Sequence, residues 1–216
     1  MAGGTPCPIP SPKVPLMDET ARTRLDEQLA FLLEADRLKG VLRRNPLADG
    51  SRRENSAEHS WHLALFAIVL AEHATEPVDV CRVAQMLLLH DLVEIDAGDT
   101  FAYDDDGHQD KAEREQAAAD RLFAILPESQ AVALRALWDE FEAQESSDAR
   151  FAHAIDRLQP ILLNAAAGGG AWRTHSVSRE QVRAYNRRIG AAAPTLWNHA
   201  EAVLAAAVED GLLSDR

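Results

Sequence analysis

The sequence predicts an all-α fold, a multi-helix bundle formed by one domain over residues 18–216. Beyond residue 17, apolar residues recur at spacings of three and four along most of the chain, which is the period of a helix. No run of alternating β-branched residues bounded by hairpin turns interrupts this pattern. Capping residues, prolines and glycines divide it into segments of ordinary helix length. A chain of 216 residues is typical of a single domain.

Residues 1–17 differ from the rest of the chain and are expected to be a disordered, Pro-rich leader. Five prolines fall between Pro6 and Pro15, and the segment has neither a basic start nor a continuous apolar region, so it does not resemble a secretory signal. The two cysteines, Cys7 and Cys81, provide no disulfide framework and no paired metal-ligand spacing. We therefore expect a cytoplasmic location, where thiols stay reduced.

The first two helices are expected on either side of an arginine-rich polar loop. A helix over 18–39 has acidic residues in its opening turn and is ended by Gly40. The next helix, over 56–73, is capped by Ser56 and ends before Pro77. Because its apolar residues lie nearly all round, we expect it to be central to the bundle.

The remaining helices follow the same local signals. A helix over 78–94 leads into acidic turns at 96–99 and 104–107, where Asp and Gly favour turns. Pro127 and the glycine run 168–170 mark further boundaries. The later helices are expected at 109–126, 128–144 and 147–166, followed by two that Ser178 and Pro194 open.

Composition excludes two classes of partner. Twenty-two Lys and Arg against 35 Asp and Glu leave a net charge of −13, which opposes binding to a nucleic-acid polymer or an anionic membrane surface. The most apolar stretch, 63–71, is much shorter than the roughly 20 residues that span a bilayer. A small anionic substrate held by a metal is compatible with this composition.

The pair His90-Asp91 is the first candidate for chemistry. It follows the apolar run 86–89, and two ionisable side chains in such a setting need a compensating partner. Glu94 lies on the same helical stripe as His90, with Asp91 beside it, so all three can face one cleft. His, Asp and Glu are ligands and proton carriers at divalent metal sites.

Two further residues extend this candidate site. His59 lies on the preceding helix and Asp156 lies in an otherwise apolar stretch of a later one. His59, His90, Asp91 and Asp156 thus supply four potential metal ligands from three helices. The segments 52–60 (RRENSAEHS) and 89–99 (LHDLVEIDAGD) resemble the HD-domain metal phosphohydrolases, and within them the branch that contains the bacterial 5′-deoxynucleotidases and the HD-domain-containing protein 2 group.

The resemblance implies that these four residues bind one divalent cation. Cobalt or manganese is favoured, although zinc, iron or magnesium also suits imidazole and carboxylate ligands. It further implies an enzyme that hydrolyses a (deoxy)nucleoside 5′-monophosphate to nucleoside and phosphate, and a homodimer. The substrate is then a small-molecule nucleotide, with no nucleic-acid polymer or membrane as partner.

The resemblance also suggests roles for individual residues. Glu94 would activate water or protonate the leaving oxygen. Asp99 would accept a hydrogen bond from the sugar hydroxyl or orient the nucleophile. Arg43 is the first choice for the phosphate-binding arginine and Arg44 the second. The deoxynucleotidases place a tryptophan near this arginine, whereas 43–51 has no aromatic residue, so the sugar preference stays open.

Other histidines near these motifs have structural alternatives. His62 and His73 share a helix face with His59, and we expect both to be hydrogen-bonded core residues. His153 lies one turn before Asp156 and would either orient a ligand or lie on the surface.

Other residues around the motifs are likewise expected to have supporting rather than catalytic roles. We expect Glu54 to pair with Arg52 and hold the loop against the site. The acidic run 104–106 is expected to be a mobile lid rather than a second cation site. Trp172 would either wall the substrate pocket or anchor the core.

Two alternative functions remain at this stage. The same site would act on another phosphorylated nucleotide, such as an alarmone, a cyclic dinucleotide or a nucleoside triphosphate. A highly charged substrate is disfavoured because each added phosphate requires its own cations. Alternatively the chain is a catalytically silent metal- or nucleotide-binding module. Silent relatives often lose the proton carrier, whereas this chain keeps Glu94 and Asp99.

Overall fold

The computed structural model describes residues 23–104 and 107–215, and it confirms the all-α fold class. The expected leader, the first residues of the 18–39 helix, and part of the acidic run 104–106 lie outside these residues. The helices and strands are α1 (Arg24–Ala35), η1 (Asp36–Gly40), β1 (Leu42–Pro46), β2 (Arg53–Asn55), α2 (Ser56–Leu70), η2 (Ala71–His73), α3 (Val80–Leu89), η3 (His90–Val93), α4 (Glu94–Ala97), α5 (Lys111–Phe123), α6 (Glu128–Ala143), α7 (Ser147–Ala166), α8 (Gly170–Thr174), α9 (Arg179–Asn186), α10 (Ile189–Ala192) and α11 (Pro194–Glu209).

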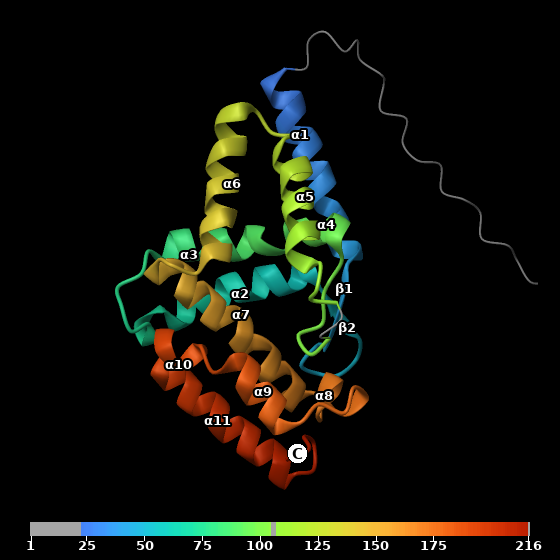
Figure 1. The fold of residues 1–216 in the computed structure, drawn as a ribbon, viewed down its shortest axis with the longest axis vertical. Coiled ribbons are helices and arrows are strands. Elements are labelled where there is room, and N and C mark those ends of the chain that lie inside the picture. The colour runs from blue at the N-terminus through green and yellow to red at the C-terminus, as the bar shows by residue number, and fades with distance from the viewer. Residues whose placement is uncertain (1–22, 105–106, 216) are drawn as a thin grey trace, which may run out of the picture.

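The helices are arranged around α7, which packs against α2, α3, α10 and α11. In Figure 1, α2 and α3 cross the middle of the molecule, α1, α5 and α6 stand above them, and α8 to α11 lie below. The face of α7 that is turned inward is almost wholly apolar, with Phe151, Ile155, Leu158 and Ile161 buried. Burial of this face holds α7 against the N-terminal part of α2, and both helices carry residues of the candidate site.

A second apolar cluster lies between α1, η3, α5 and α6. Its centre contains Phe31, Val93, Phe123 and Trp138, all buried. This cluster also contains Leu92 and Val93 of η3. The segment that carries His90 and Asp91 is therefore anchored by apolar packing.

Part of the loop expected between the first two helices is instead a short hairpin. Strands β1 and β2 pair antiparallel, with Leu42 opposite Asn55 and Pro46 opposite Arg53. The Arg53 guanidinium donates to the Leu42 carbonyl at 2.8 Å and also to the Arg43 carbonyl. These side-chain contacts support a strand pair that is too short and too polar to be read from hydrophobic alternation.

The helix expected over 78–94 changes type at its end. It is α-helical to Leu89 and then continues as the 3₁₀ segment η3. Trp138 Nε1 donates to the His90 carbonyl at 3.2 Å, while the Glu94 backbone N–H bonds the Asp91 and Leu92 carbonyls. Three residues make one turn of a 3₁₀ helix, so Asp91 and Glu94 project from the same side.

Helix α2 differs from its expectation in two ways. Asn55 rather than Ser56 caps it, accepting from the Glu58 backbone N–H at 2.9 Å in a reciprocal capping box. The helix is also not central to the bundle, because Trp61, Ile68 and Val69 are about 60% exposed or more. One apolar face of α2 is buried and the other faces outward.

The remaining expected helices lie close to their ranges, whereas α8 and α10 are short helices that the sequence did not predict. Helix α7 has the expected bounds, and α5 and α6 differ from theirs by at most three residues at either end. Among the described residues, no helix has both the length and the apolar character needed to cross a bilayer.

The stability of the domain is expected to depend on the buried face of α7. Replacing Leu158 with Ala should lower the free energy of unfolding by about 2–5 kcal/mol, because it removes a buried side chain and leaves a cavity. Val132→Ala on the exposed face of α6 should change it by less than about 0.5 kcal/mol. Urea unfolding of the metal-free protein measures both, and equal effects would contradict this account of the core.

Candidate metal centre

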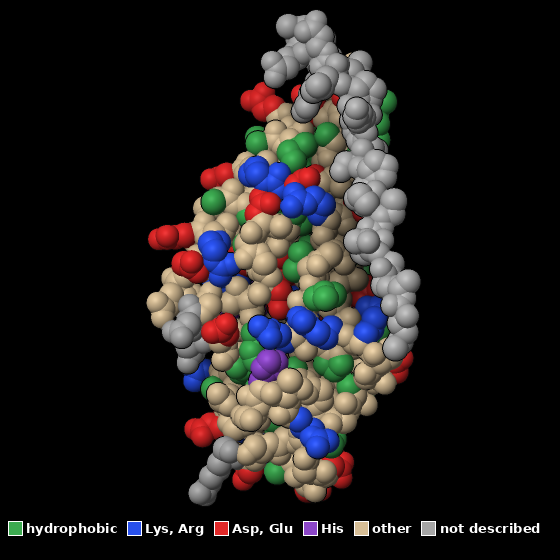
Figure 2. All heavy atoms as spheres, turned by 90° about the vertical axis from the view of Figure 1, so that its right-hand side faces the viewer, with side chains coloured by type: hydrophobic (Ala, Val, Ile, Leu, Met, Phe, Trp, Pro, Cys, Tyr) green, Lys and Arg blue, Asp and Glu red, His purple; other side chains and the backbone are tan. Residues whose placement is uncertain are grey.

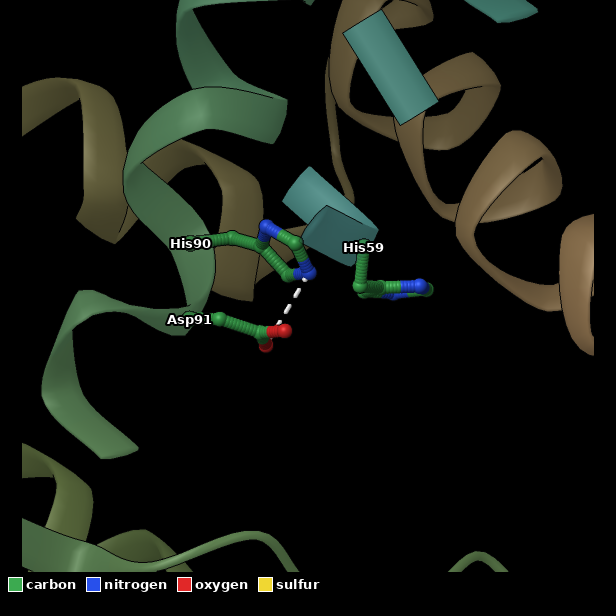
Figure 3. Close-up of side chains that lie close together, drawn as sticks. All are labelled: His59, His90 and Asp91. Atoms are coloured by element: carbon green, nitrogen blue, oxygen red, sulfur yellow. Dashed lines mark ion pairs between the residues drawn. The ribbon is translucent and has the colours of Figure 1, made fainter. Parts of the chain in front are cut away.

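Three elements bring the expected metal ligands together. The first turn of α2 carries His59, η3 carries His90 and Asp91, and the middle of α7 carries Asp156. Figure 3 shows His59 beside the His90–Asp91 pair, with the ion pair dashed. Single side-chain atoms of His59, His90 and Asp91 lie within 4.8 Å of one another.

Asp156 closes the group. Its Oδ1 lies 3.0 Å from His59 Nε2 and 3.8 Å from His90 Nε2. His90 Nε2 in turn lies 3.0 Å from Asp91 Oδ1. The two imidazoles thus direct the same ring nitrogen toward carboxylates: His59 toward Asp156, and His90 toward both Asp91 and Asp156.

The hydrogen bond at Nδ1 of His90 determines which nitrogen of this ring is free to bind a cation. His90 Nδ1 donates to the Leu87 carbonyl at 2.8 Å, so a neutral His90 has its lone pair on Nε2. Among the described residues, that Nε2 has no well-formed hydrogen-bond partner, although it is buried and faces carboxylate oxygens. Lone pairs of imidazole and carboxylate repel one another unless a cation lies between them. Two imidazole nitrogens and two carboxylates form a donor set suited to a divalent transition metal.

The shifted pKa values of His90 and Asp156 also indicate that this cluster requires positive charge. Burial opposes charge on both partners, yet the carboxylates of Asp91 and Asp156 raise the pKa of His90 to about 9. Burial likewise opposes ionisation of Asp156, but the nearby imidazoles of His59 and His90 hold the pKa of Asp156 well below its usual range. Without a metal, the cluster takes up protons in its place.

Glu94 lies beside this cluster as expected. It is buried, and the Ser56 hydroxyl donates to its Oε2 at 2.6 Å. Burial, followed by the negative charge of Asp91, raises the pKa of Glu94 to about 8. A carboxyl group whose pKa lies near neutrality can both take up and release a proton.

Asp99 reaches the same space because the chain turns sharply at Gly98. Gly98 has a φ of 76°, which disfavours any other residue there, and its N–H bonds the Glu94 carbonyl at 2.9 Å. Burial raises the pKa of Asp99, whereas the charge of Arg43 opposes this.

Of the two candidate arginines, only Arg43 enters the cluster. Its Nη1 donates to Asp91 Oδ2 at 2.9 Å and lies 3.8 Å from Asp99 Oδ1. Burial works against its charge, but Asp91, Glu94 and Asp99 raise the pKa of Arg43. Arg44, the next residue of β1, is exposed and lines a cavity beside the cluster, together with Arg43.

That cavity has an aromatic wall of which the sequence identified Trp172 alone. Arg43, Asp99 and Asp156 line the cavity together with aromatic rings from three different segments: Phe101, Tyr103, Trp172 and Tyr185. Arg157 lies over the ring of Tyr185, 4.7 Å from its centroid. Figure 2 shows basic side chains gathered across the middle of the face that carries β1 and β2, with acidic side chains between them.

Several supporting residues lie elsewhere than expected. The predicted Glu54–Arg52 pair was wrong, because Arg52 binds Glu58 at 2.6 Å and Glu54 is buried beside His59. A capping box places the Glu58 carboxylate next to Arg52. Asp104 accepts from the Gly107 backbone N–H, as in a turn.

The other histidines are not at the metal centre. His153 bonds the Phe141 carbonyl at 2.9 Å and stacks on that ring, with burial lowering its pKa to about 4. His62 packs against Phe66 and reaches Gln159, and His73 lies in η2. Trp172 both lines the cavity and is buried in the core, so its two expected roles are compatible.

Comparison with known proteins gives consistent matches. The family model described as HD domain matches residues 35–197. Two curated relatives, the proteins named 5′-deoxynucleotidase HDDC2 from Bos taurus and Homo sapiens, are 32% and 30% identical over 136 residues, which is 61% of this chain. The match spans 65% of the length of each of these relatives.

A solved structure resembles nearly the whole described fold. It is a predicted metal-dependent phosphohydrolase from Magnetospirillum magnetotacticum MS-1, 52% identical in sequence, with a TM-score of 0.84. The similarity covers 88% of this chain and 96% of that one.

Removing the negative charge of the shared carboxylate should strongly weaken metal binding. Asp156→Asn replaces the carboxylate that faces both imidazoles, so we expect affinity for Co²⁺ or Mn²⁺ to fall at least about 100-fold. Titration calorimetry of metal-stripped protein measures this, with His73→Ala as the control. Equal affinity in the Asp156→Asn variant and the wild type would exclude Asp156 as a ligand.

Proposed function

The chain belongs to the HD domain family, and from this premise we propose that it is a metal-dependent phosphohydrolase of nucleotides. The observation that carries the proposal is the convergence of His59, His90, Asp91 and Asp156 beside a buried arginine. The similarity to a predicted metal-dependent phosphohydrolase supports the reaction class. Fold alone would not, because one fold hosts many activities.

The four residues would hold one divalent cation, with cobalt or manganese preferred and zinc, iron or magnesium as alternatives. A bound metal of this kind lowers the pKa of water and offsets negative charge on a phosphate oxygen. The chain itself supplies the remaining groups. Arg43, which has buried carboxylates on several sides, would exchange part of its contact with Asp91 and Asp99 for the phosphate of the substrate.

Glu94 is the proposed proton carrier. Its hydrogen bond from Ser56 orients one oxygen, and its raised pKa suits either activation of water or protonation of the leaving oxygen. Asp99, which lines both the cluster and the cavity, would accept a hydrogen bond from the sugar or orient the nucleophile. Both residues act next to the metal without belonging to its proposed ligands.

We further propose that the substrate is a nucleoside 5′-monophosphate, of which the deoxy form is favoured by the names of the curated relatives. A phosphate at Arg43 would leave the nucleoside in the aromatic cavity, where rings of Tyr103 and Tyr185 can stack on a base. One buried arginine matches one phosphate better than a polyphosphate chain. The exposed, free Cys81 is compatible with the cytoplasmic location that we propose.

The outward face of α2 supports a homodimer. Trp61, Leu65, Ile68 and Val69 follow the spacing of one helical face and are exposed. Leu25, Leu29, Leu32 and Leu33 repeat this pattern on α1. Exposed apolar stripes of this kind are typical of protein interfaces, and we propose that a second copy of the chain covers them.

The reaction is tested by inorganic phosphate release from ribo- and deoxyribonucleoside 5′-monophosphates, with cobalt, manganese, magnesium or zinc added to metal-stripped protein. Metal-dependent release is expected. In the Glu94→Gln variant kcat should fall at least about 100-fold while metal affinity is retained, because only the proton carrier is lost.

Nucleoside triphosphates and cyclic dinucleotides in the same panel separate the alternatives. If phosphate is released from these substrates and not from the monophosphates, the proposed substrate becomes a nucleotide with more than one phosphate. The absence of turnover from every substrate with every metal, despite tight nucleotide binding, would favour the silent binding module instead.

Dimer formation is tested at the α2 face. Ile68→Asp introduces a charge into the exposed stripe and should shift the protein from dimer to monomer in sedimentation velocity at micromolar concentration. Val132→Asp on α6 makes the same change at an equally exposed site outside these stripes and should leave the dimer intact. A monomeric wild type would contradict the proposal.

A further inference from the structure

Gln159 connects the proposed metal centre to its surroundings, yet none of the roles above uses it. It lies on α7 one turn after Asp156 and is fully buried. Its Oε1 lies 3.2 Å from His59 Nδ1, and its Nε2 lies 2.8 Å from Glu54 Oε1 and 3.2 Å from His62 Nδ1. One amide thus contacts three ionisable side chains of β2 and α2.

The orientation of this amide follows from the chemistry of its neighbours. An ionised carboxylate only accepts hydrogen bonds, so the NH₂ group of Gln159 must face Glu54. Its oxygen therefore faces His59. Because an amide oxygen also only accepts, His59 must carry its proton on Nδ1, and its lone pair is on Nε2. That is the nitrogen that points at Asp156.

Gln159 also holds the buried carboxylate of Glu54. Glu54 is 2% exposed, and the amide of Gln159 provides its one well-formed side-chain hydrogen bond among the described residues. Its second oxygen lies 3.4 Å from His59 Nδ1 and 3.9 Å from Arg43 Nε, and both that oxygen and Arg43 Nε are buried without a hydrogen-bond partner. The second carboxylate oxygen of Glu54 therefore lies between the proposed metal ligand His59 and the proposed phosphate-binding residue Arg43.

We propose that Gln159 is a positioning residue that sets the metal-binding nitrogen of His59 and keeps Glu54 from closing onto Arg43. This rests on the proposed function, because it assumes a metal at His59 and a phosphate at Arg43. Without the amide, His59 loses an acceptor that fixes its ring, and Glu54 keeps a buried charge without a donor. The carboxylate then moves the short distance to the Arg43 guanidinium.

The main test compares metal affinity in the full-length protein. Gln159→Met keeps the side-chain volume and removes both the acceptor and the donors, so Co²⁺ affinity in chelator competition should fall about 10- to 100-fold. Gln159→Glu should also bind metal more weakly, because two buried carboxylates would then face each other. Ser60→Ala is the control: this hydroxyl is buried next to His59 on α2 and has no hydrogen-bond partner among the described residues, so its removal should leave affinity unchanged.

Exchanging the side chains of residues 54 and 159 distinguishes a positioning role from a general disturbance of the structure. In the double variant Glu54→Gln, Gln159→Glu, the new carboxylate accepts from both His59 and the new amide, and the total charge is unchanged. Metal affinity should return to within about threefold of wild type, since the hydrogen bond that orients His59 is restored. A double variant no better than Gln159→Glu alone would overturn the proposal, as would a Gln159→Met variant with wild-type affinity.

A second readout concerns Arg43. At saturating metal, Gln159→Met should raise KM for a nucleoside 5′-monophosphate several-fold more than it lowers kcat, because Glu54 then competes with phosphate for the guanidinium. An unchanged KM would exclude this part of the proposal. Metal affinity is measured without substrate, so a wild type that hydrolyses no nucleotide would overturn the proposed function and leave the test of His59 intact.

Discussion

One largely buried arginine among five carboxylates is the constraint on which the rest of the structure depends. Glu54, Asp91, Glu94, Asp99 and Asp156 all lie near Arg43, and three of these carboxylates, Glu54, Asp91 and Glu94, are buried. Such an excess of negative charge in a buried volume is unfavourable unless cations or protons neutralise it. Burial, together with the charge of Asp91, raises the pKa values of Glu94 and Asp99, whereas at His90 the neighbouring carboxylates raise the pKa against the effect of burial.

The backbone departs from a regular α-helix in two segments that carry side chains of this cluster. The 3₁₀ segment η3 places Asp91 and Glu94 on one side, and the Trp138 indole takes the carbonyl that a continuing α-helix would use. The β1–β2 hairpin carries Arg43 to the carboxylates and turns Arg44 outward. The first departure brings His90, Asp91 and Glu94 to one cluster, and the second brings Arg43 to it.

Helix α2 combines two requirements in one element. Its inner face carries His59 and, through Gln159, is tied to α7, while its outer face is apolar and exposed. This explains why its sequence is apolar nearly all round although the helix is not central to the fold. If a second copy covers the outer face, the assembly and the metal centre are built on opposite sides of the same helix, and the packing that supports one also supports the other.

The sequence alone was sufficient for the features that local chemistry determines. Capping residues, prolines and glycines predicted α5, α6 and α7 to within three residues, although not the short helices α8 and α10, and the spacing of His59, His90, Asp91 and Asp156 predicted side chains that the fold does bring together. It could not decide between Arg43 and Arg44, assign Glu54 its partner, or identify Gln159, Tyr103 and Tyr185. These depend on pairs far apart in the chain, such as Glu54 with Gln159, and on which way a strand residue faces. Only the packing of α7 against α2 and of the hairpin against both determines such contacts, because side chains separated by about 100 positions meet only once the helices have docked.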